Sequence, residues 1–292
     1  MVRSGILLKH LLIVGFRRLA AIFGVTNDHV VFLEGGLGSQ ILNVMAFWNL
    51  QGKLGEDVAK CNLSYFRQSD SSNFWPWRLD AFGIKKESFA KFESNQKFRI
   101  FLRKKDWVEQ REIDEGYWAN LRAAYSERFS FDPGIIRDYF AEVADIALPE
   151  HFGVVHFRRG DYLKVASKLV TFEDYMELLE LTVPLFPRTV LFISDSPFSA
   201  ADADNLCKLI GSEKTAIFLD NPDLDAFKLH CILRMSDVLV TANSTFSFSA
   251  ALLGKVGQKV FSPLNFHAGE NAERYNSTFR PNAGFVVWKN FQ

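Results

Sequence analysis

The second half of the chain alternates short apolar runs with longer segments of helical periodicity. The apolar runs predict strands and cover residues 153–157, 189–193, 215–219, 237–241 and 258–261. The segments between them repeat apolar residues at helical spacing and cover residues 172–185, 199–210, 224–235 and 246–253. Strands that alternate with helices are typical of a parallel sheet with helices on both faces. The pattern therefore predicts an α/β fold.

The first half opens with a unit of the same kind. An apolar run at residues 29–33 predicts a strand, and the glycine-rich turn 35–38 (Gly-Gly-Leu-Gly) follows it directly. Ser39 then precedes apolar residues at helical spacing that continue to about Gly52. Serine is a favoured N-cap residue, so we predict a helix capped by Ser39. Strand, glycine turn and helix together form the opening unit of a nucleotide-binding type of α/β fold.

Residues 60–148 are less regular, and the dense alternating charge in this part is typical of a solvated surface. Pro149 precedes the first strand of the regular half, so a domain boundary is expected there. The division predicted from these patterns is an N-terminal extension at residues 1–28, a first domain at 29–149 and a second at 150–292.

The N-terminal extension is basic and apolar. Residues 1–27 contain four cations and no acid, set among many large apolar side chains. No uncharged run approaches the roughly 18–20 residues that span a bilayer. The composition of residues 1–25 predicts a helix lying in the surface of an anionic membrane, with a packed first helix as the alternative.

Composition narrows the function. Lysine plus arginine and aspartate plus glutamate both number 34, so the 292-residue chain has no net charge, which argues against a nucleic-acid-binding protein. The three cysteines are widely spaced, which favours free thiols over a disulfide framework or a zinc site.

Polar residues follow four of the predicted strands, and ligands of open parallel sheets bind outside the carboxyl ends of the strands. The four groups, in chain order, are His156-Phe-Arg158-Arg159-Gly-Asp161, Ser194-Asp195, Asp220-Asn221-Pro222 and Asn243-Ser244-Thr245. We therefore expect these groups to meet in one crevice.

The residue types indicate a diphosphate ligand with a base beside it. Arg158 and Arg159 offer paired donors that suit phosphate oxygens, and Asp161 is placed to orient Arg158. The segment 243–245 opens a predicted helix, whose N-terminus also favours an anion. Asp195 is an acceptor for the donor edge of a base such as guanine.

These motifs resemble those of the bacterial α-1,2-fucosyltransferases, glycosyltransferase family eleven. The resemblance runs in the same order from about residue 31 to residue 253. The segments that carry it are Gly35-Gly-Leu-Gly-Ser39-Gln40, His156-Phe-Arg158-Arg159-Gly-Asp161-Tyr162, Ser194-Asp195 and Thr241-Ala-Asn243-Ser244-Thr245-Phe246-Ser247. The chain departs from the family pattern at Ser39, Ser196, Phe248 and Ser249.

The resemblance implies a GT-B arrangement, in which two Rossmann-like domains face a central cleft. It implies GDP-β-L-fucose as donor, inversion at the anomeric carbon, and neither a metal nor another cofactor. The acceptor would be an oligosaccharide or a lipid-linked glycan, often at O2 of galactose, in surface polysaccharide (O-antigen) synthesis. An enzyme of this kind is expected in the cytoplasm, at the inner face of the membrane.

The resemblance also implies roles for individual residues. Arg158 would bind the β-phosphate, with Asp161 as the second catalytic candidate. The other donor-binding candidates are His156 and Asp195 at guanine, Ser244 and Thr245 at the phosphates, and Arg159, Ser194, Asn243 and Phe246 beside them. Residues of the acceptor or sugar-side loop are Gly36, Gly38, Ser39 and Gln40.

Two alternatives stay open. Asp223-Leu224-Asp225 follows a predicted strand and could hold a divalent cation with a diphosphate, as in a metal-dependent GT-A glycosyltransferase. Alternatively, the chain could bind a nucleotide sugar without turning it over.

Overall fold

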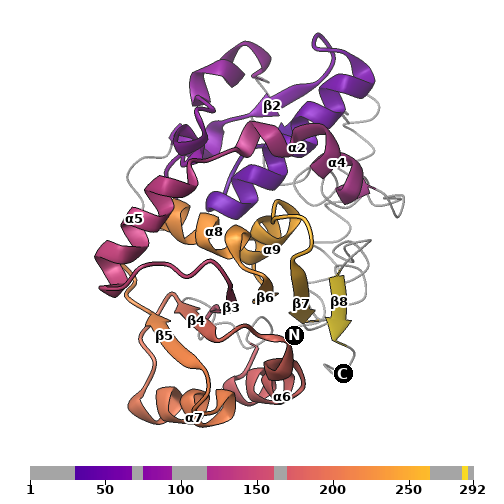
Figure 1. The fold of residues 1–292 in the computed structure, drawn as a ribbon. Coiled ribbons are helices and arrows are strands. Elements are labelled where there is room, and N and C mark those ends of the chain that lie inside the picture. Colours follow the sequence, from indigo (N-terminus) through magenta and orange to yellow (C-terminus); the bar gives the residue numbers. More distant parts are fainter. Residues whose placement is uncertain (1–29, 68–74, 94–116, 161–169, 264–284, 289–292) are drawn as a thin grey trace, which may run out of the picture.

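The computed structural model describes residues 30–67, 75–93, 117–160, 170–263 and 285–288. Six parallel strands form the main sheet, which belongs to the C-terminal half (Figure 1). They are β3 (Phe152–Phe157), β4 (Thr189–Ser194), β5 (Thr215–Leu219), β6 (Val238–Val240), β7 (Lys259–Pro263) and β8 (Phe285–Trp288). The helices between them are α6 (Phe172–Thr182), η7 (Val183–Leu185), α7 (Ala200–Ile210), α8 (Ala226–Met235) and α9 (Thr245–Leu252).

The strands lie in the order β5-β4-β3-β6-β7-β8, and every pairing is parallel. The chain therefore starts in the middle of the sheet, runs to one edge, and returns to β6 on the other side of β3. This is the strand order of a Rossmann-like nucleotide-binding sheet. The reversal between β3 and β6 is the switch point at which such sheets bind their ligands.

Alternating residues of the strands face two separate cores, as the two-residue repeat of a strand requires. Val154 packs with α5 (Pro133–Ala144), α8 and α9 on one face, whereas Val155 packs with α6 and α7 on the other. Both faces are thus covered, which explains why the strands read as continuous apolar runs.

The N-terminal part contains a second, smaller parallel sheet. Strands β1 (Val30–Phe32) and β2 (Lys60–Asn62) flank α2 (Leu37–Leu54). Shorter helices complete this part: η1 (Ser64–Arg67), η2 (Leu79–Phe82), η3 (Lys86–Phe92), α4 (Tyr117–Tyr125) and η4 (Ser126–Phe129). Helix α5, which precedes the expected boundary at Pro149, packs with the core of the main sheet.

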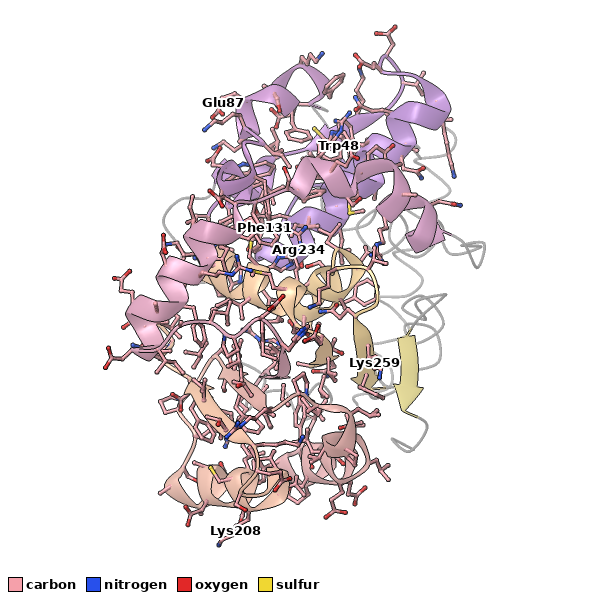
Figure 2. The ribbon with its side chains drawn as sticks, in the orientation of Figure 1. Trp48, Glu87, Phe131, Lys208, Arg234 and Lys259 are labelled. Atoms are coloured by element: carbon pink, nitrogen blue, oxygen red, sulfur yellow. The ribbon has the colours of Figure 1, made fainter. Side chains whose placement is uncertain are left out.

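The two parts share one hydrophobic core and several polar contacts. Phe248 and Leu252 of α9 belong to the core that surrounds α2. The guanidinium of Arg234, on α8, donates to the carbonyl of Phe129 at 2.7 Å and to that of Leu253 at 3.1 Å. Figure 2 shows Arg234 beside Phe131, between the upper and lower parts of the molecule. Burial lowers the pKa of Arg234 to about 10, yet it remains a cation at neutral pH.

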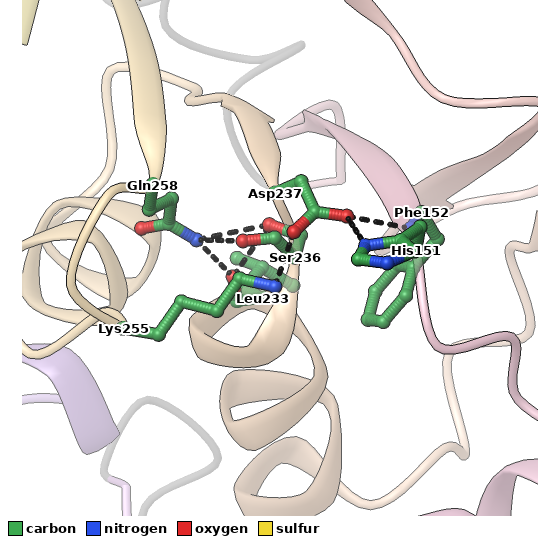
Figure 3. A network of polar contacts seen from close by, with 7 residues as sticks. All are labelled: His151, Phe152, Leu233, Ser236, Asp237, Lys255 and Gln258. Atoms are coloured by element: carbon green, nitrogen blue, oxygen red, sulfur yellow. Dashed lines mark hydrogen bonds and ion pairs between the residues drawn. The ribbon is translucent and has the colours of Figure 1, made fainter.

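At the amino edge of the main sheet, polar side chains bind one another (Figure 3). The carboxylate of Asp237 accepts from the backbone N–H of Phe152 at 3.1 Å and contacts His151 at 3.2 Å and Lys255. The amide of Gln258 donates to the carbonyl of Leu233 at 2.8 Å and to the carbonyl and hydroxyl of Ser236. This network ties the start of β6 to the start of β3.

The predicted α/β fold with parallel strands is confirmed, and each strand predicted in the second half is present. The predicted cap at Ser39 is wrong: α2 begins at Leu37 with Gly36 as its N-cap. Gly35, at a φ of 82°, turns the chain sharply enough for the helix to start three residues early. Sequence patterns missed the short strand β2 and also β8. The N-terminal extension expected at residues 1–28 lies outside the described residues. Among the helices that are described, none is long and apolar enough to cross a membrane.

Candidate functional site

A cavity of about 910 Å³ lies at the carboxyl edge of the main sheet, where the strand order reverses between β3 and β6. The C-terminal half contributes mainly His156, Arg158, Ser194, Asp195, 221–226, Ser244, Thr245 and Phe246. The N-terminal half contributes residues 35–39 together with Tyr65, Trp75 and Arg78. The polar groups expected from four strand ends are thus brought together with the glycine turn of the first half.

Arg158 is held in the cavity wall by a carboxylate. Its Nη1 lies 2.7 Å from Oδ2 of Asp195, and both side chains are about four-fifths buried, with exposures of 21% and 22%. The other oxygen of Asp195 accepts the backbone N–H groups of Arg159 at 2.8 Å and Gly160 at 2.9 Å. Asp195 therefore fixes both the loop after β3 and the guanidinium, the orienting role expected of Asp161.

This arrangement bears on the expected contact between Asp195 and guanine. A carboxylate has about four lone-pair sites, and three of those on Asp195 are taken by the contacts above. One site on Oδ2 remains. A base can share that oxygen with Arg158, so Asp195 can accept one further hydrogen bond. Its contact with guanine stays a prediction.

His156 is a neutral, buried member of the cavity wall. It is 4% exposed at the end of β3, and its ring lies 5.4 Å from that of Phe246. Burial lowers the pKa of His156 to about 3, an effect opposed by Asp195 and reinforced by Arg158. Its buried Nδ1 has no hydrogen-bond partner among the described residues. The imidazole can therefore give or take one neutral hydrogen bond with a ligand at physiological pH.

The N-terminus of α9 faces the same cavity. The hydroxyl of Ser244 caps the helix by accepting from the N–H of Phe246 at 3.2 Å, which confirms the predicted helix start. The hydroxyl of Thr245 lies 3.0 Å from that of Ser39 across the two halves. Ser39 thus contacts α9 rather than capping its own helix.

Gly38 allows the two halves to approach closely at this point. A Cβ atom at Gly38 would lie 2.3 Å from the carbonyl oxygen of Thr245 and 2.5 Å from the Cα of Phe246. Helices α2 and α9 therefore meet backbone to backbone beside the cavity. Only glycine fits this contact.

Gln40 organises the N-terminal wall from behind. Its side chain is fully buried and donates to the carbonyls of Gly35 at 2.7 Å and Pro76 at 2.8 Å. Its Oε1 accepts the backbone N–H of Arg78 at 2.9 Å. Gln40 does not line the cavity; it joins the glycine turn to the segment that carries Trp75 and Arg78.

Several predicted ligand residues lie elsewhere. Arg159 does not line the cavity, because its guanidinium pairs with Asp202 of α7 at 2.9 Å. Asn243 is 3% exposed and is likewise absent from the lining. Asp161 lies outside the described residues.

Sequence reasoning missed Tyr65, Trp75 and Arg78 as cavity residues. The only signal was the run of aromatic side chains that includes Trp75 and Trp77. Their place in the wall depends on tertiary contacts such as those of Gln40.

The acidic pair considered for a metal also borders the cavity. Asp223 and Asp225 both line it, and Asp225 caps α8 by accepting from the N–H of Lys228 at 3.0 Å. Among the residues that the structure describes, no cluster of three or more His, Cys, Asp or Glu side chains could hold a metal ion.

Comparison with known proteins gives no neighbour for this chain: no family model, no curated protein and no solved structure matches it.

Proposed function

We propose that this chain is an inverting glycosyltransferase of the GT-B type. It transfers L-fucose from GDP-β-L-fucose to a glycan hydroxyl, with O2 of galactose as the favoured position. The observation that carries the proposal is the position of Arg158, beside the N-terminus of α9, in a large cavity at the switch point of a nucleotide-binding type of sheet.

The donor diphosphate would bind between Arg158 and the first turn of α9. An arginine and a helix N-terminus together provide positive charge and directed donors, which suit two adjacent phosphates. The cavity is large enough for a nucleotide sugar, since ligand sites of about 300–1,000 Å³ are usual. The neutral imidazole of His156 and the remaining lone pair of Asp195 are the groups available for a base.

During transfer the bond between the anomeric carbon and the β-phosphate oxygen breaks, and the acceptor oxygen forms a bond to the opposite face of that carbon. Negative charge develops on the departing GDP, which Arg158 stabilises. Because Asp195 already fixes the guanidinium, little reorganisation is needed as this charge grows. The acceptor loses its proton to a base; Asp161 remains a candidate for this role, and an oxocarbenium-like transition state requires only a weak base.

The decisive experiment measures release of nucleoside diphosphate from GDP-fucose, GDP-mannose, UDP-galactose and UDP-glucose with a panel of galactosides. We expect turnover of GDP-fucose only. Consumption of a UDP-sugar alone would contradict the assigned donor. Binding of GDP by calorimetry without turnover on any acceptor would favour the non-enzymatic alternative.

A metal-dependent GT-A enzyme is the second candidate, because Asp223 and Asp225 both line the cavity. Chelation distinguishes the two. The GT-B proposal expects activity to persist in EDTA, whereas loss with EDTA and recovery with Mn²⁺ would favour the alternative.

We also propose that the enzyme works at the cytoplasmic face of a membrane, held by residues 1–25. Deleting these residues should release the protein from anionic vesicles. Unchanged vesicle binding after the deletion would contradict this part of the proposal.

A further inference from the structure

We propose that Trp75 and Arg78 form an acceptor subsite that selects a saccharide carrying an oxyanion, either a carboxylate or a phosphate ester. The inference rests on the proposed function, because it takes the cavity to be the place where donor and acceptor meet. It adds a charge requirement that the donor chemistry does not demand.

Trp75 provides an apolar surface in the cavity wall. Its side chain is 46% exposed although it lines the cavity, and its ring covers the glycine turn, since a Cβ at Gly36 would lie 3.8 Å away. Its backbone N–H donates to the hydroxyl of Tyr65 at 3.0 Å, which fixes the backbone that carries the indole ring. A flat, fixed and accessible indole is suited to packing against the apolar face of a sugar ring.

Arg78 adds a positive charge beside that surface. The centre of its guanidinium lies 5.9 Å from the Trp75 ring, and Gln40 fixes its backbone. Its Nε is buried and has no acceptor among the described residues, where no carboxylate pairs with it either. A buried donor without an acceptor is destabilising, so the site favours a ligand that supplies an acceptor.

The other arginines near the cavity differ in this respect. Arg158 pairs with Asp195, and Arg159 pairs with Asp202. Each of them has a carboxylate partner before a ligand arrives, whereas no described carboxylate pairs with Arg78. The planar guanidinium binds carboxylate and phosphate through two parallel hydrogen bonds, so either oxyanion would satisfy it.

The two features fit one ligand. A sugar ring on Trp75 places its substituents next to Arg78, and an oxyanion on that ring or its neighbour can reach the guanidinium. A uronic acid and a sugar phosphate both have this chemistry. The donor diphosphate is assigned to Arg158 and α9, on the part of the wall that the C-terminal half contributes.

The test compares saccharides that differ only in the group at C6, which is neutral in one and anionic in the other two. Galactose, galacturonic acid and galactose 6-phosphate are titrated into the 292-residue protein saturated with GDP, with binding followed by saturation-transfer NMR. We expect at least one of the two anionic sugars to bind about tenfold or more tightly than galactose, as one charge-assisted pair allows. Which of them binds more tightly identifies the oxyanion as carboxylate or phosphate.

The variant Arg78→Met should abolish this preference, because methionine keeps apolar contact with Trp75 but removes the charge and donors. Trp75→Ala should weaken the binding of all three sugars by a similar factor. The matched control is Arg128→Met, since Arg128 also packs on a tryptophan, Trp48 at 4.5 Å, but does not line this cavity. This control should keep the full preference, and thermal unfolding of each variant checks that it is folded.

Equal binding of neutral and anionic sugars by the unmodified protein would overturn the subsite, as would a preference that survives Arg78→Met. Calorimetry with GDP alone distinguishes failure of the subsite from failure of the proposed function. If GDP binds and no charge preference appears, the subsite fails and the function stands. If GDP does not bind but an Arg78-dependent preference is seen, the selective subsite stands and the assigned donor fails.

Discussion

The two edges of the six-stranded sheet carry similar polar residues in different arrangements. At the amino edge, the carboxylate of Asp237 contacts Lys255, His151 and the backbone N–H of Phe152, the first residue of β3 (Figure 3). At the carboxyl edge, Arg158 and Asp195 also form an ion pair, but they border a cavity of about 910 Å³. The amino-edge network joins parts of the protein to each other, whereas the carboxyl-edge groups remain accessible to a ligand.

The difference follows from how a parallel sheet is connected. All strands end at the same edge, so the chain spreads outward there into the starts of the next helices, and a crevice opens where the strand order reverses. At the amino edge the chain returns from α8 to β6 through two residues, Ser236 and Asp237. Asp237 is therefore held close to β3, and its hydrogen bonds are used within the protein.

The largest effect is expected from Arg158→Ala, which should slow release of GDP from GDP-fucose by about 10²–10³-fold, as for other donors that stabilise developing negative charge. Lys255→Ala is the control, because it also removes a cation paired with an aspartate, but at the other edge. Its turnover should not change. Equal losses in both variants would show that ion pairs at either edge support activity only through the fold.

Gly38→Ala tests the close contact between the two halves beside the cavity. The new methyl group would overlap the backbone of Thr245, so α2 and α9 must separate. We expect the free energy of unfolding, measured in urea, to fall by about 1–3 kcal/mol. Gly52→Ala, in the same helix, meets nothing nearer than 3.9 Å and should be neutral or stabilising. Tolerance of both substitutions would mean that the halves are not in close contact.

The buried His156 at the carboxyl end of β3 should make the stability of the protein depend on pH. Burial holds the pKa of His156 near 3, so below pH 6.5 the unfolded chain binds a proton that the folded protein excludes. Stability is therefore complete above pH 6.5 and falls as the pH decreases from there toward 3. Between pH 7 and pH 5 His156 should account for about 2 kcal/mol of the loss.

Urea unfolding at both pH values measures this contribution. His156→Gln should reduce the loss by that amount. The control His151→Gln changes a side chain that is 74% exposed and keeps His156, so the contribution of His156 to the loss should remain. An identical pH dependence in all three proteins would show that His156 is solvated.

The smallest effect is expected at the amino edge. Asp237→Ala should lower the unfolding free energy by about 1–2 kcal/mol, because the N–H of Phe152 and the charge of Lys255 lose their acceptor. Asp80→Ala, which removes an exposed ion pair with Lys85, should cost less than about 1 kcal/mol. Turnover by Asp237→Ala should be unaffected; a loss of activity larger than the loss of stability would contradict the structural role of this edge.

Sequence patterns could predict the strands and their convergence, because both follow from apolar runs and from the direction of a parallel sheet. They could not separate Arg158 from Arg159. In extended chain, neighbouring side chains point in opposite directions, so one arginine enters the cavity and the other reaches Asp202 of α7. Which of the two arginines enters the cavity depends on the face of β3 that α7 covers.

The N-terminal wall was less predictable for a related reason. Trp75 and Arg78 belong to no regular element among the strands and long helices, so no periodicity marks them. Gln40 brings them to the cavity through hydrogen bonds to Pro76 and Arg78. The same residue was predicted to meet a ligand, because a polar side chain beside a glycine turn has the same appearance in sequence whether it points inward or outward.

The buried guanidinium of Arg234 has a consequence for protein engineering. It is a residue of the C-terminal half, and one of its carbonyl partners, that of Phe129, belongs to the N-terminal half. Chimeras that exchange the first half would leave this cation without its partner unless the carbonyl at position 129 is kept in place. The practical junction for such exchanges therefore lies before η4, which keeps Phe129 and α5 with the main sheet, and each replacement sequence must bring a glycine at position 38.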